Sequence, residues 1–482
     1  MLGVDSPRVA GGGQGGGPAR PAHPVFRGLT GRDFEGLPYG VAHPGTTDDL
    51  RVLGQAGRDA VLWELQTRRS LVMACHWRVG KDLAGNPVAK RLFDNMLSYC
   101  CDYVPKSLAV ALAPGSPRAE LLASCGLEYE TTDDLPKALQ DGPHNVILAE
   151  ASADNLRTLA ANRKQVRQLT DRGGWLVLWG LTPDGLDHFN ELVGVEHLLR
   201  PYEMERVELN ADRDYLVSGL TDRNVAILSG EAISKTTFFA ADDAYSYVVD
   251  LDDIAPFCTL PGPAYWKRPD AEPKVDRWPR NMVNGFTGED HWRYGFVLSL
   301  DEGAPTRWTM QLPREEQIVG FSFAPGPYHP VTKMRLSFDI PGEEPVELPV
   351  RPVRERQEFS FAPRRAKTVT VELAEWEASS PQEVLGVDNL RLWVRRSPEF
   401  HEKVRPLLNI GALVKYPMGR GGILLNQLRI LSDSEKKKHL DAAPADEREA
   451  LARHLEQNAR KKATILRTVL RNLGIANERT AP

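Results

Sequence analysis

Seven aromatic residues gather in the middle of the chain, in a stretch rich in proline and in short apolar alternations. They are Tyr265, Trp266, Trp278, Trp292, Tyr294, Trp308 and Tyr328. Aromatic rings stack on the apolar faces of sugars, while polar groups at the rim bind the hydroxyls. This set therefore predicts carbohydrate binding, and it is the strongest functional signal in the sequence.

Some of the tryptophans have a second interpretation as core residues. Trp292, Trp308 and Trp393 lie in runs with a period of two, which favours burial inside a sheet for these three. Trp266 and Trp278 lie in irregular, proline-rich chain, where an exposed and a buried role are equally open. The carbohydrate-binding candidates are Tyr265, Trp266, Trp278, Trp292, Tyr294 and Tyr328.

No arrangement for catalysis is recognisable in the sequence. Glycoside hydrolysis needs two carboxylates that flank one bond, but the adjacent pairs Asp252-Asp253 and Glu289-Asp290 would point to opposite faces of an extended segment. Acyl transfer needs a Cys or Ser on the turn after a central strand, and the turn that begins at Gly180 has neither. His76, beside Trp77, is expected to be structural. We predict no catalytic residue.

Cofactor binding is not predicted either. Gly173-Gly174 precedes a strand and the segment 419–422 is rich in glycine, but neither has the spacing of a dinucleotide or phosphate-binding loop. Asp388-Asn389, before a late strand, leaves a structural ion site open. Metal binding is therefore undecided at this level.

The bulk composition is that of a globular protein. The chain has 482 residues, a formal net charge of −5 and 41% hydrophobic residues, which suggests roughly three domains. Acidic and basic residues are mixed, so neither nucleic acid nor a membrane is an expected partner. The five cysteines have no metal-ligand spacing and are expected to be mostly buried thiols. Residues 1–22 lack an apolar signal region and are expected to form a flexible leader.

One pattern occurs twice in the chain. Residues 23–33 (HPVFRGLTGRD) return as residues 214–224 (DYLVSGLTDRN), and each copy is followed by an apolar strand and a helix. Leu97 follows Gly28 by 69 positions, whereas Leu470 follows Gly219 by 251, so the second copy carries 182 extra positions. Internal similarity of this kind indicates two related units, of which the second is interrupted.

The local patterns identify what fills the interruption. Alternating apolar strands and helices from about 104 to 262 predict a parallel sheet covered on both faces. From about 263 to 398, period-two runs between Pro and Gly turns indicate a β-sandwich. A hairpin at 411–425 and a last helix then complete the interrupted unit. We predict a leader at 1–22, a partial α/β unit at 23–103, an α/β domain at 104–262 and 399–482, and an inserted sandwich at 263–398.

These segments resemble a known arrangement. The runs 420–428 (RGGILLNQL) and 470–474 (LRNLG), with Lys461-Lys462 between them, are similar to the non-catalytic C-terminal regions of bacterial family-two-type (β-galactosidase-like) glycoside hydrolases, where class I glutamine amidotransferase-like domains follow the catalytic part. The runs 281–286, 291–294 and 385–393 resemble galactose-binding-like (discoidin-type) sandwiches. The resemblance implies α/β plus all-β architecture with two flavodoxin-like, amidotransferase-like units, the first partial and the second interrupted by the sandwich. It carries over neither activity, because the amidotransferase nucleophile has no counterpart and the hydrolase barrel has no room.

The leading functional hypothesis is a carbohydrate-associated accessory or assembly protein. Its expected partners are a glycan and either a catalytic glycoside hydrolase or a second copy of the chain. One alternative is an active glycoside hydrolase with a site between the sandwich and the α/β units, and another is a purely structural oligomerisation module. The resemblance implies that relatives are exported, although this chain shows no signal peptide.

Overall fold

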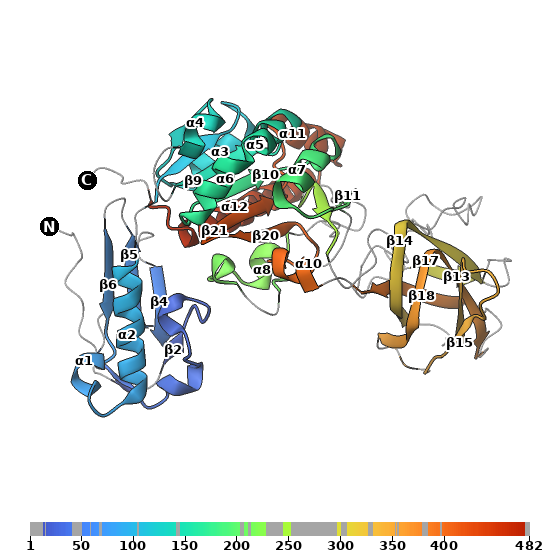
Figure 1. Cartoon of the computed structure of the whole chain (residues 1–482), viewed down its shortest axis with the longest axis horizontal. Helices are drawn as coiled ribbons and strands as arrows, with labels where there is room; N and C mark the ends of the chain where they lie inside the picture. The colour runs from blue at the N-terminus through green and yellow to red at the C-terminus, as the bar shows by residue number, and fades with distance from the viewer. Residues whose placement is uncertain are drawn as a thin grey trace.

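The structure is a computed structural model of the chain (Figure 1). It describes residues 13–14, 16–40, 51–57, 59–66, 70–103, 106–140, 145–202, 207–210, 214–227, 244–251, 296–299, 306–325, 331–351, 353, 356–377, 384–395 and 398–477. As expected, the chain combines an α/β part with an all-β part. Within the described residues, no helix is both long and apolar enough to span a membrane.

A seven-stranded sheet forms the centre of the α/β domain. Its order is β19-β20-β21-β10-β9-β7-β8. The bounds are Leu108–Ala111 for β7, Glu130–Thr131 for β8, Val146–Glu150 for β9, Trp175–Trp179 for β10, Arg405–Pro406 for β19, Leu413–Met418 for β20 and Gly421–Asn426 for β21. The strands from β8 to β21 run parallel, and β20 and β19 continue the sheet antiparallel. The parallel part has the 2-1-3-4-5 order of flavodoxin-like folds.

Helices cover both faces of this sheet, because its central strands are apolar on both sides. Two separate clusters of buried side chains lie on the two faces. The helices are α3 (Pro117–Ser124), α4 (Leu135–Gln140), α5 (Ala153–Ala161), α6 (Arg163–Asp171), α7 (Leu186–Val193), α11 (Asp433–Ala442) and α12 (Arg448–Asn472). The pattern over 155–170 predicted one helix, but the structure has two, divided at Asn162.

Shorter elements complete the described chain. They are β1 (Gly13–Gln14), β3 (Pro38–Tyr39), α1 (Val79–Asp82), η3 (Pro183–Gly185), β11 (Leu199–Pro201), β12 (Tyr247–Val249) and α10 (Pro398–Lys403).

The N-terminal unit is built from an antiparallel sheet and one long helix. The sheet has the order β2-β4-β5-β6, with β2 at Gly17–Pro18, β4 at Arg51–Ala56, β5 at Asp59–Gln66 and β6 at Leu71–Cys75. Helix α2 (Pro87–Cys101) packs against it, capped by Asn86 as the sequence predicted. Every strand pair in this sheet is antiparallel. The unit therefore corresponds to the antiparallel end of the larger sheet and has no parallel strands of its own among its described residues.

The repeated sequence forms the same local structure twice. The first copy is a 3-10 turn, η1 (Pro24–Phe26), followed by η2 (Gly31–Phe34); the second is η4 (Tyr215–Val217) followed by α8 (Asp222–Val225). Thr30 and Thr221 each begin the second turn with a capping box. Gly28 and Gly219 between the turns have φ of +72° and +95°, a region that favours glycine.

The helix that follows each copy holds its turn through one asparagine. Asn95 Nδ2 in α2 donates to the carbonyl oxygens of Val25 and Arg27 at 3.1 and 2.9 Å. Asn472 Nδ2 in α12 donates to the equivalent oxygens of Leu216 and Ser218 at 2.8 and 3.0 Å.

This equivalence corrects the alignment of the two helices. Asn95 follows Gly28 by 67 positions and Asn472 follows Gly219 by 253, so the excess is 186 positions and not 182. The difference of four residues is about one helical turn. Apolar periodicity alone cannot distinguish registers that differ by one turn, because both place apolar residues on the same face.

The all-β part is a six-stranded antiparallel sheet bent around its own core. Its order is β13-β18-β14-β17-β15-β16. The bounds are Phe296–Ser299 for β13, Arg307–Pro325 for β14, Val331–Phe338 for β15, Val346–Pro349 for β16, Gln357–Trp376 for β17 and Val384–Val394 for β18. Where the sequence predicted only short strands, β14 and β17 run for 19 and 20 residues, and register shifts interrupt their pairing. These irregularities let both strands bend and serve two parts of one core.

The cysteines differ from expectation. Of the four described, Cys125 is buried and Cys75 is half-buried, but Cys100 and Cys101 at the end of α2 are exposed, and all four are free. Cys258 lies outside the described residues.

Candidate functional site

The six carbohydrate-binding candidates lie where the structure gives no description. Tyr265, Trp266, Trp278, Trp292, Tyr294 and Tyr328 fall outside the described residues, as do the carboxylate pairs at 252–253 and 289–290. Their role stays a prediction. Among the described residues, no group of three His, Cys, Asp or Glu side chains is placed to hold a metal ion.

Two of the three tryptophans that were assigned to the core are described, and they differ. Trp308 is 5% exposed in the core, as its period-two pattern favoured. Trp393 is half-buried on the outer face, so the prediction of a core role for it is wrong. Its neighbours Leu392 and Val394 point into the core, and side chains alternate along a strand.

The carboxyl ends of the parallel strands are where doubly wound folds bind ligands. Here the strand order reverses between β7 and β9, and Glu150 is the last residue of β9. Glu150 forms an ion pair with Arg118 of α3, and their side chains are 35% and 25% exposed. A partly exposed ion pair therefore lies at the edge where a ligand site is expected.

Glycine stands at the turn after β10, the place where an acyl-transfer domain would carry its nucleophile. Gly180 there has φ of +78°, and a Cβ at this position would collide with the Arg118 guanidinium. Gln427 fixes the turn, because its side chain accepts from Leu181 N at 2.7 Å and donates to Leu181 O at 3.1 Å. Arginine thus fills the space that a reactive side chain would need. The arrangement can bind or be structural, but it offers no attacking group.

His76 has the structural role that the sequence predicted. Its Nε2 accepts from Trp63 Nε1 at 3.3 Å. The two units also match at this point: the Gly40 N–H donates to His76 O, and the Ser246 N–H donates to Gln427 O. His76 therefore corresponds to Gln427, and the paired positions share no acid or base.

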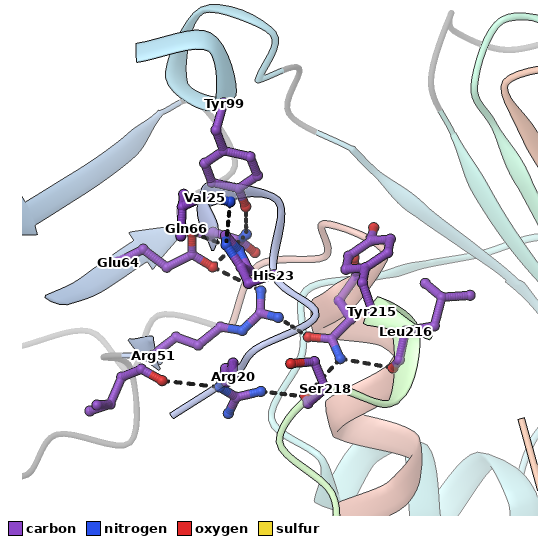
Figure 2. Close-up of polar contacts among 12 residues, drawn as sticks. Arg20, His23, Val25, Arg51, Glu64, Gln66, Tyr99, Tyr215, Leu216 and Ser218 are labelled. Carbon is purple, nitrogen blue, oxygen red and sulfur yellow. Dashed lines mark hydrogen bonds and ion pairs between the residues drawn. The ribbon is translucent and has the colours of Figure 1, made fainter. Parts of the chain in front are cut away.

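The densest polar cluster lies at the junction of the N-terminal unit and the α/β domain (Figure 2). Arg51 on β4 and Glu64 on the neighbouring strand β5 are paired in register and form a 2.8 Å ion pair. Their side chains are 3% and 0% exposed. Arg51 also donates through Nη2 to Asn472 Oδ1 of α12. Arg20 binds Val52 O through Nε and, through Nη1, Ser218 O of the other unit at 2.5 Å. Two arginines of one unit therefore dock on the turn and helix of the next.

Burial sets the protonation of the cluster. Desolvation, assisted by Arg51 and then Arg20, lowers the pKa of His23 to about 2, so this histidine is neutral. Its Nε2 lies 3.8 Å from Glu64 Oε2, but a neutral ring at that distance makes a contact and not an ion pair. Burial also raises the pKa of Tyr99, which receives a hydrogen bond from Gln66 at 3.3 Å. The cluster holds acid and base side chains, but they are sealed from solvent, which gives it a structural character.

The same position in the second unit carries different charges. His23 Nδ1 accepts from Val25 N at 3.4 Å, and Asp214 Oδ1 accepts from Leu216 N at 2.9 Å, so both cap the repeated turn. Strand pairing places Lys415 where the first unit has Glu64. Lys415 Nζ lies 2.5 Å from Asp214 Oδ2. One unit thus pairs a cap histidine with a carboxylate, and the other pairs a cap carboxylate with an ammonium.

Sequence reasoning missed the Arg51–Glu64 pair. The signal available was Glu64 itself, a charge inside the apolar run 60–65. A charge within such a strand is nearly always paired when buried, but its partner is set by strand register, which the sequence does not give.

A second network of buried polar side chains lies where the α/β domain meets the sandwich. His197 Nδ1 lies 3.0 Å from Asp250 Oδ1, and Tyr416 OH lies 2.9 Å from His197 Nε2. Arg314 of β14 reaches the other oxygen of Asp250 at 3.2 Å. His197 and Asp250 are fully buried and offer no surface to a substrate. Through Arg314, this network links the sandwich to the α/β domain.

Comparisons with known proteins yield structural matches only. No family model matches the sequence, and no curated protein matches it. Similar solved structures include the family 32 carbohydrate-binding module of Streptococcus pneumoniae EndoD (12% identity, 30% of this chain and 100% of that chain, TM-score 0.24). Two modules of Clostridium perfringens are also similar. One was solved with GalNAc-β-1,3-galactose (15% identity, 28% and 99%, TM-score 0.20). The other is the NanJ module, solved with galactose (9% identity, 30% and 99%, TM-score 0.21). At these scores the likeness carries no argument about ligand or residues.

Proposed function

We propose that this chain is a non-catalytic accessory protein of a carbohydrate-active system. In this proposal the α/β domain and the docked N-terminal unit form a scaffold, and the β-sandwich with its aromatic-rich segment binds a glycan. The observation that carries the non-catalytic part is the turn after β10, where Gly180 stands at the nucleophile position and Arg118 occupies the space beside it. The glycan part is supported by the aromatic residues of the segment 265–294.

The finer architecture belongs to the same proposal. We assign the α/β domain to the amidotransferase-like group on its strand order and its nucleophile-type turn, and the N-terminal unit to the matching end of a second such domain. The Arg51–Glu64–Asn472 junction supports an assembly role, because buried polar contacts join the N-terminal unit to the α/β domain.

The test is a screen of the whole chain on a glycan array, alongside hydrolysis of chromogenic galactosides and glucosides. We expect binding without turnover. Trp266→Ala and Trp278→Ala should each weaken glycan binding by about tenfold, since stacking of a ring contributes about 1–2 kcal/mol, and leave the thermal midpoint unchanged. Unchanged binding in both variants removes the aromatic assignment.

Other outcomes distinguish the remaining hypotheses. Turnover of a glycoside would establish a hydrolase and overturn the accessory role. Absence of both binding and turnover, with a stable dimer or larger assembly by light scattering, would leave oligomerisation as the function.

A further inference from the structure

A cluster of cationic and aromatic side chains lies on the outer face of the sandwich, outside every site described above. Strands β18, β14 and β17 lie side by side there, with Ser322 of β14 paired to Arg391 on one side and to Glu358 on the other. Phe321, Phe323 and Leu392 point into the core. Because side chains alternate along strands, Ser322, Arg391 and Trp393 share the opposite face.

Several, but not all, hydrogen-bond donors of this cluster have no acceptor. Arg356 lies with its guanidinium carbon 5.8 Å from the centre of the Trp393 ring and donates through Nη2 to Ser322 Oγ at 2.8 Å. Its Nε and the Trp393 Nε1 are buried without a hydrogen-bond partner. Within the described part of the chain, the side chain of Arg391 makes no hydrogen bond or ion pair. The half-buried Arg391 guanidinium therefore has donors available for an acceptor from outside the chain.

The charges favour an anion as that acceptor. Burial, and next the neighbouring Arg356, lowers the pKa of Arg391 to about 10. Among the described side chains, the carboxylate of Glu358 is 65% exposed and lies 3.8 Å from Arg356 Nε, beyond hydrogen-bond distance. Two guanidinium groups thus repel each other without a full counter-charge. Carboxylate and sulfate groups match the guanidinium fork with two parallel hydrogen bonds.

The surroundings of Trp393 favour a sugar as the carrier of the anion. Gly320 is paired with Trp393, and a Cβ there would meet Phe359 O at 2.7 Å and Trp393 Cβ at 3.4 Å. Because Gly320 has no side chain, β14 packs close beside the Trp393 indole. A half-buried indole beside two cations offers an apolar platform and a charged clamp together.

We infer that Arg356, Arg391 and Trp393 form a subsite for the carboxylate or sulfate group of an acidic polysaccharide, with its ring against Trp393. The inference deepens the proposed function and rests on it for the sugar, whereas the anion recognition rests on the cluster alone. The anion accepts from the guanidinium groups of Arg391 and Arg356, and the sugar ring lies against the indole of Trp393. Neutral glycans lack the group that this subsite recognises.

The test is affinity electrophoresis of the full chain in gels that contain polygalacturonate, dextran sulfate or neutral dextran. We expect retardation by at least one acidic polymer and none by dextran. Arg391→Gln should weaken that binding by more than about tenfold, since it removes a charge-assisted bond of about 1.5–3 kcal/mol. Arg365→Gln is the matched control: this arginine of β17 is 75% exposed and pairs with Glu315, so the same charge change should leave binding within about twofold.

A second variant keeps the test decisive if Arg391→Gln does not fold. Trp393→Phe keeps an aromatic ring but reduces the area on which a sugar can stack, and it should weaken binding severalfold with an unchanged circular dichroism spectrum. Carboxylate and sulfate are distinguished by which polymer binds, and competition by sodium sulfate as strong as by the polymer would show a free-anion site and overturn the sugar part.

Three outcomes separate this inference from the proposed function. Binding of neutral glycans without binding of acidic polymers overturns the subsite and leaves the proposed function standing. Equal losses in Arg391→Gln and Arg365→Gln show general charge attraction and overturn the subsite. Binding of neither class overturns both.

Discussion

Asn472 is the residue on which the contact between the two units depends. Its Nδ2 binds two carbonyl oxygens of the repeated turn, its Oδ1 accepts from Arg51, and its backbone oxygen accepts from the Tyr215 hydroxyl. Burial raises the pKa of that tyrosine to about 12, so it donates throughout the neutral range. A single amide thus ties a helix, a turn and the neighbouring unit together.

This role predicts an asymmetric response to alanine. Asn472→Ala should lower the free energy of unfolding by about 3 kcal/mol, because it leaves buried polar groups without partners. Asn95→Ala, which removes the equivalent but more exposed bonds in the first unit, should cost about 1 kcal/mol. Urea unfolding of both variants measures the difference, and equal costs would contradict the hub role of Asn472.

At the scale of elements, the strand-to-turn junctions decide what the α/β domain can do. Strand β10 ends at Trp179, Gly180 turns the chain with a positive φ, and Gln427 after β21 holds the turn from the neighbouring strand. The conformation of this turn is therefore held by the Gln427 side chain and by glycine at position 180.

Two glycine substitutions test how tightly that turn is occupied. Gly180→Ala should destabilise by about 3 kcal/mol, since the left-handed conformation costs about 1–2 kcal/mol and the methyl group also displaces Arg118. Gly126→Ala has a similar φ of +61° but open space around its Cβ, and should cost only the conformational part, about 1 kcal/mol. Chemical denaturation reports both values; if they coincide, Arg118 is readily displaced.

At the scale of the whole molecule, the sealed junction couples folding to pH. His23 has an ordinary pKa of 6.5, which burial lowers to about 2 in the folded chain. Above pH 6.5 neither state is protonated there, so the junction keeps its full stability. As pH falls from 6.5 toward 2, the unfolded chain binds a proton that the folded chain excludes, and stability falls by up to about 1.4 kcal/mol per pH unit.

Replacing His23 isolates this contribution. His23→Asn keeps a residue that can cap the turn and removes the titrating group. Its free energy of unfolding should depend less steeply on pH than that of the wild type between about pH 4 and 6. Urea titrations at a series of pH values give both slopes, and parallel curves would exclude His23 as the source.

Much of the architecture follows from local patterns. Several features depend only on residues that are neighbours in the sequence. They are the apolar runs of β9 and β10, the cap at Asn86, the period-two strands of the sandwich and the repeated turn. Such features depend on backbone and side-chain preferences over a few positions, so the sequence alone predicts them.

Only the tertiary structure decided which residues meet. Strand register and helix docking determine the antiparallel direction of the N-terminal sheet, the one-turn shift between α2 and α12, the buried Arg51–Glu64 pair, the Asp214–Lys415 pair of the second unit and the outward position of Trp393. A shift of one residue in a strand reverses every side chain, and a shift of one turn in a helix leaves its apolar face intact. Register is fixed by contacts between segments far apart in the sequence, and for that reason the polar clusters of this protein emerge only in the folded chain.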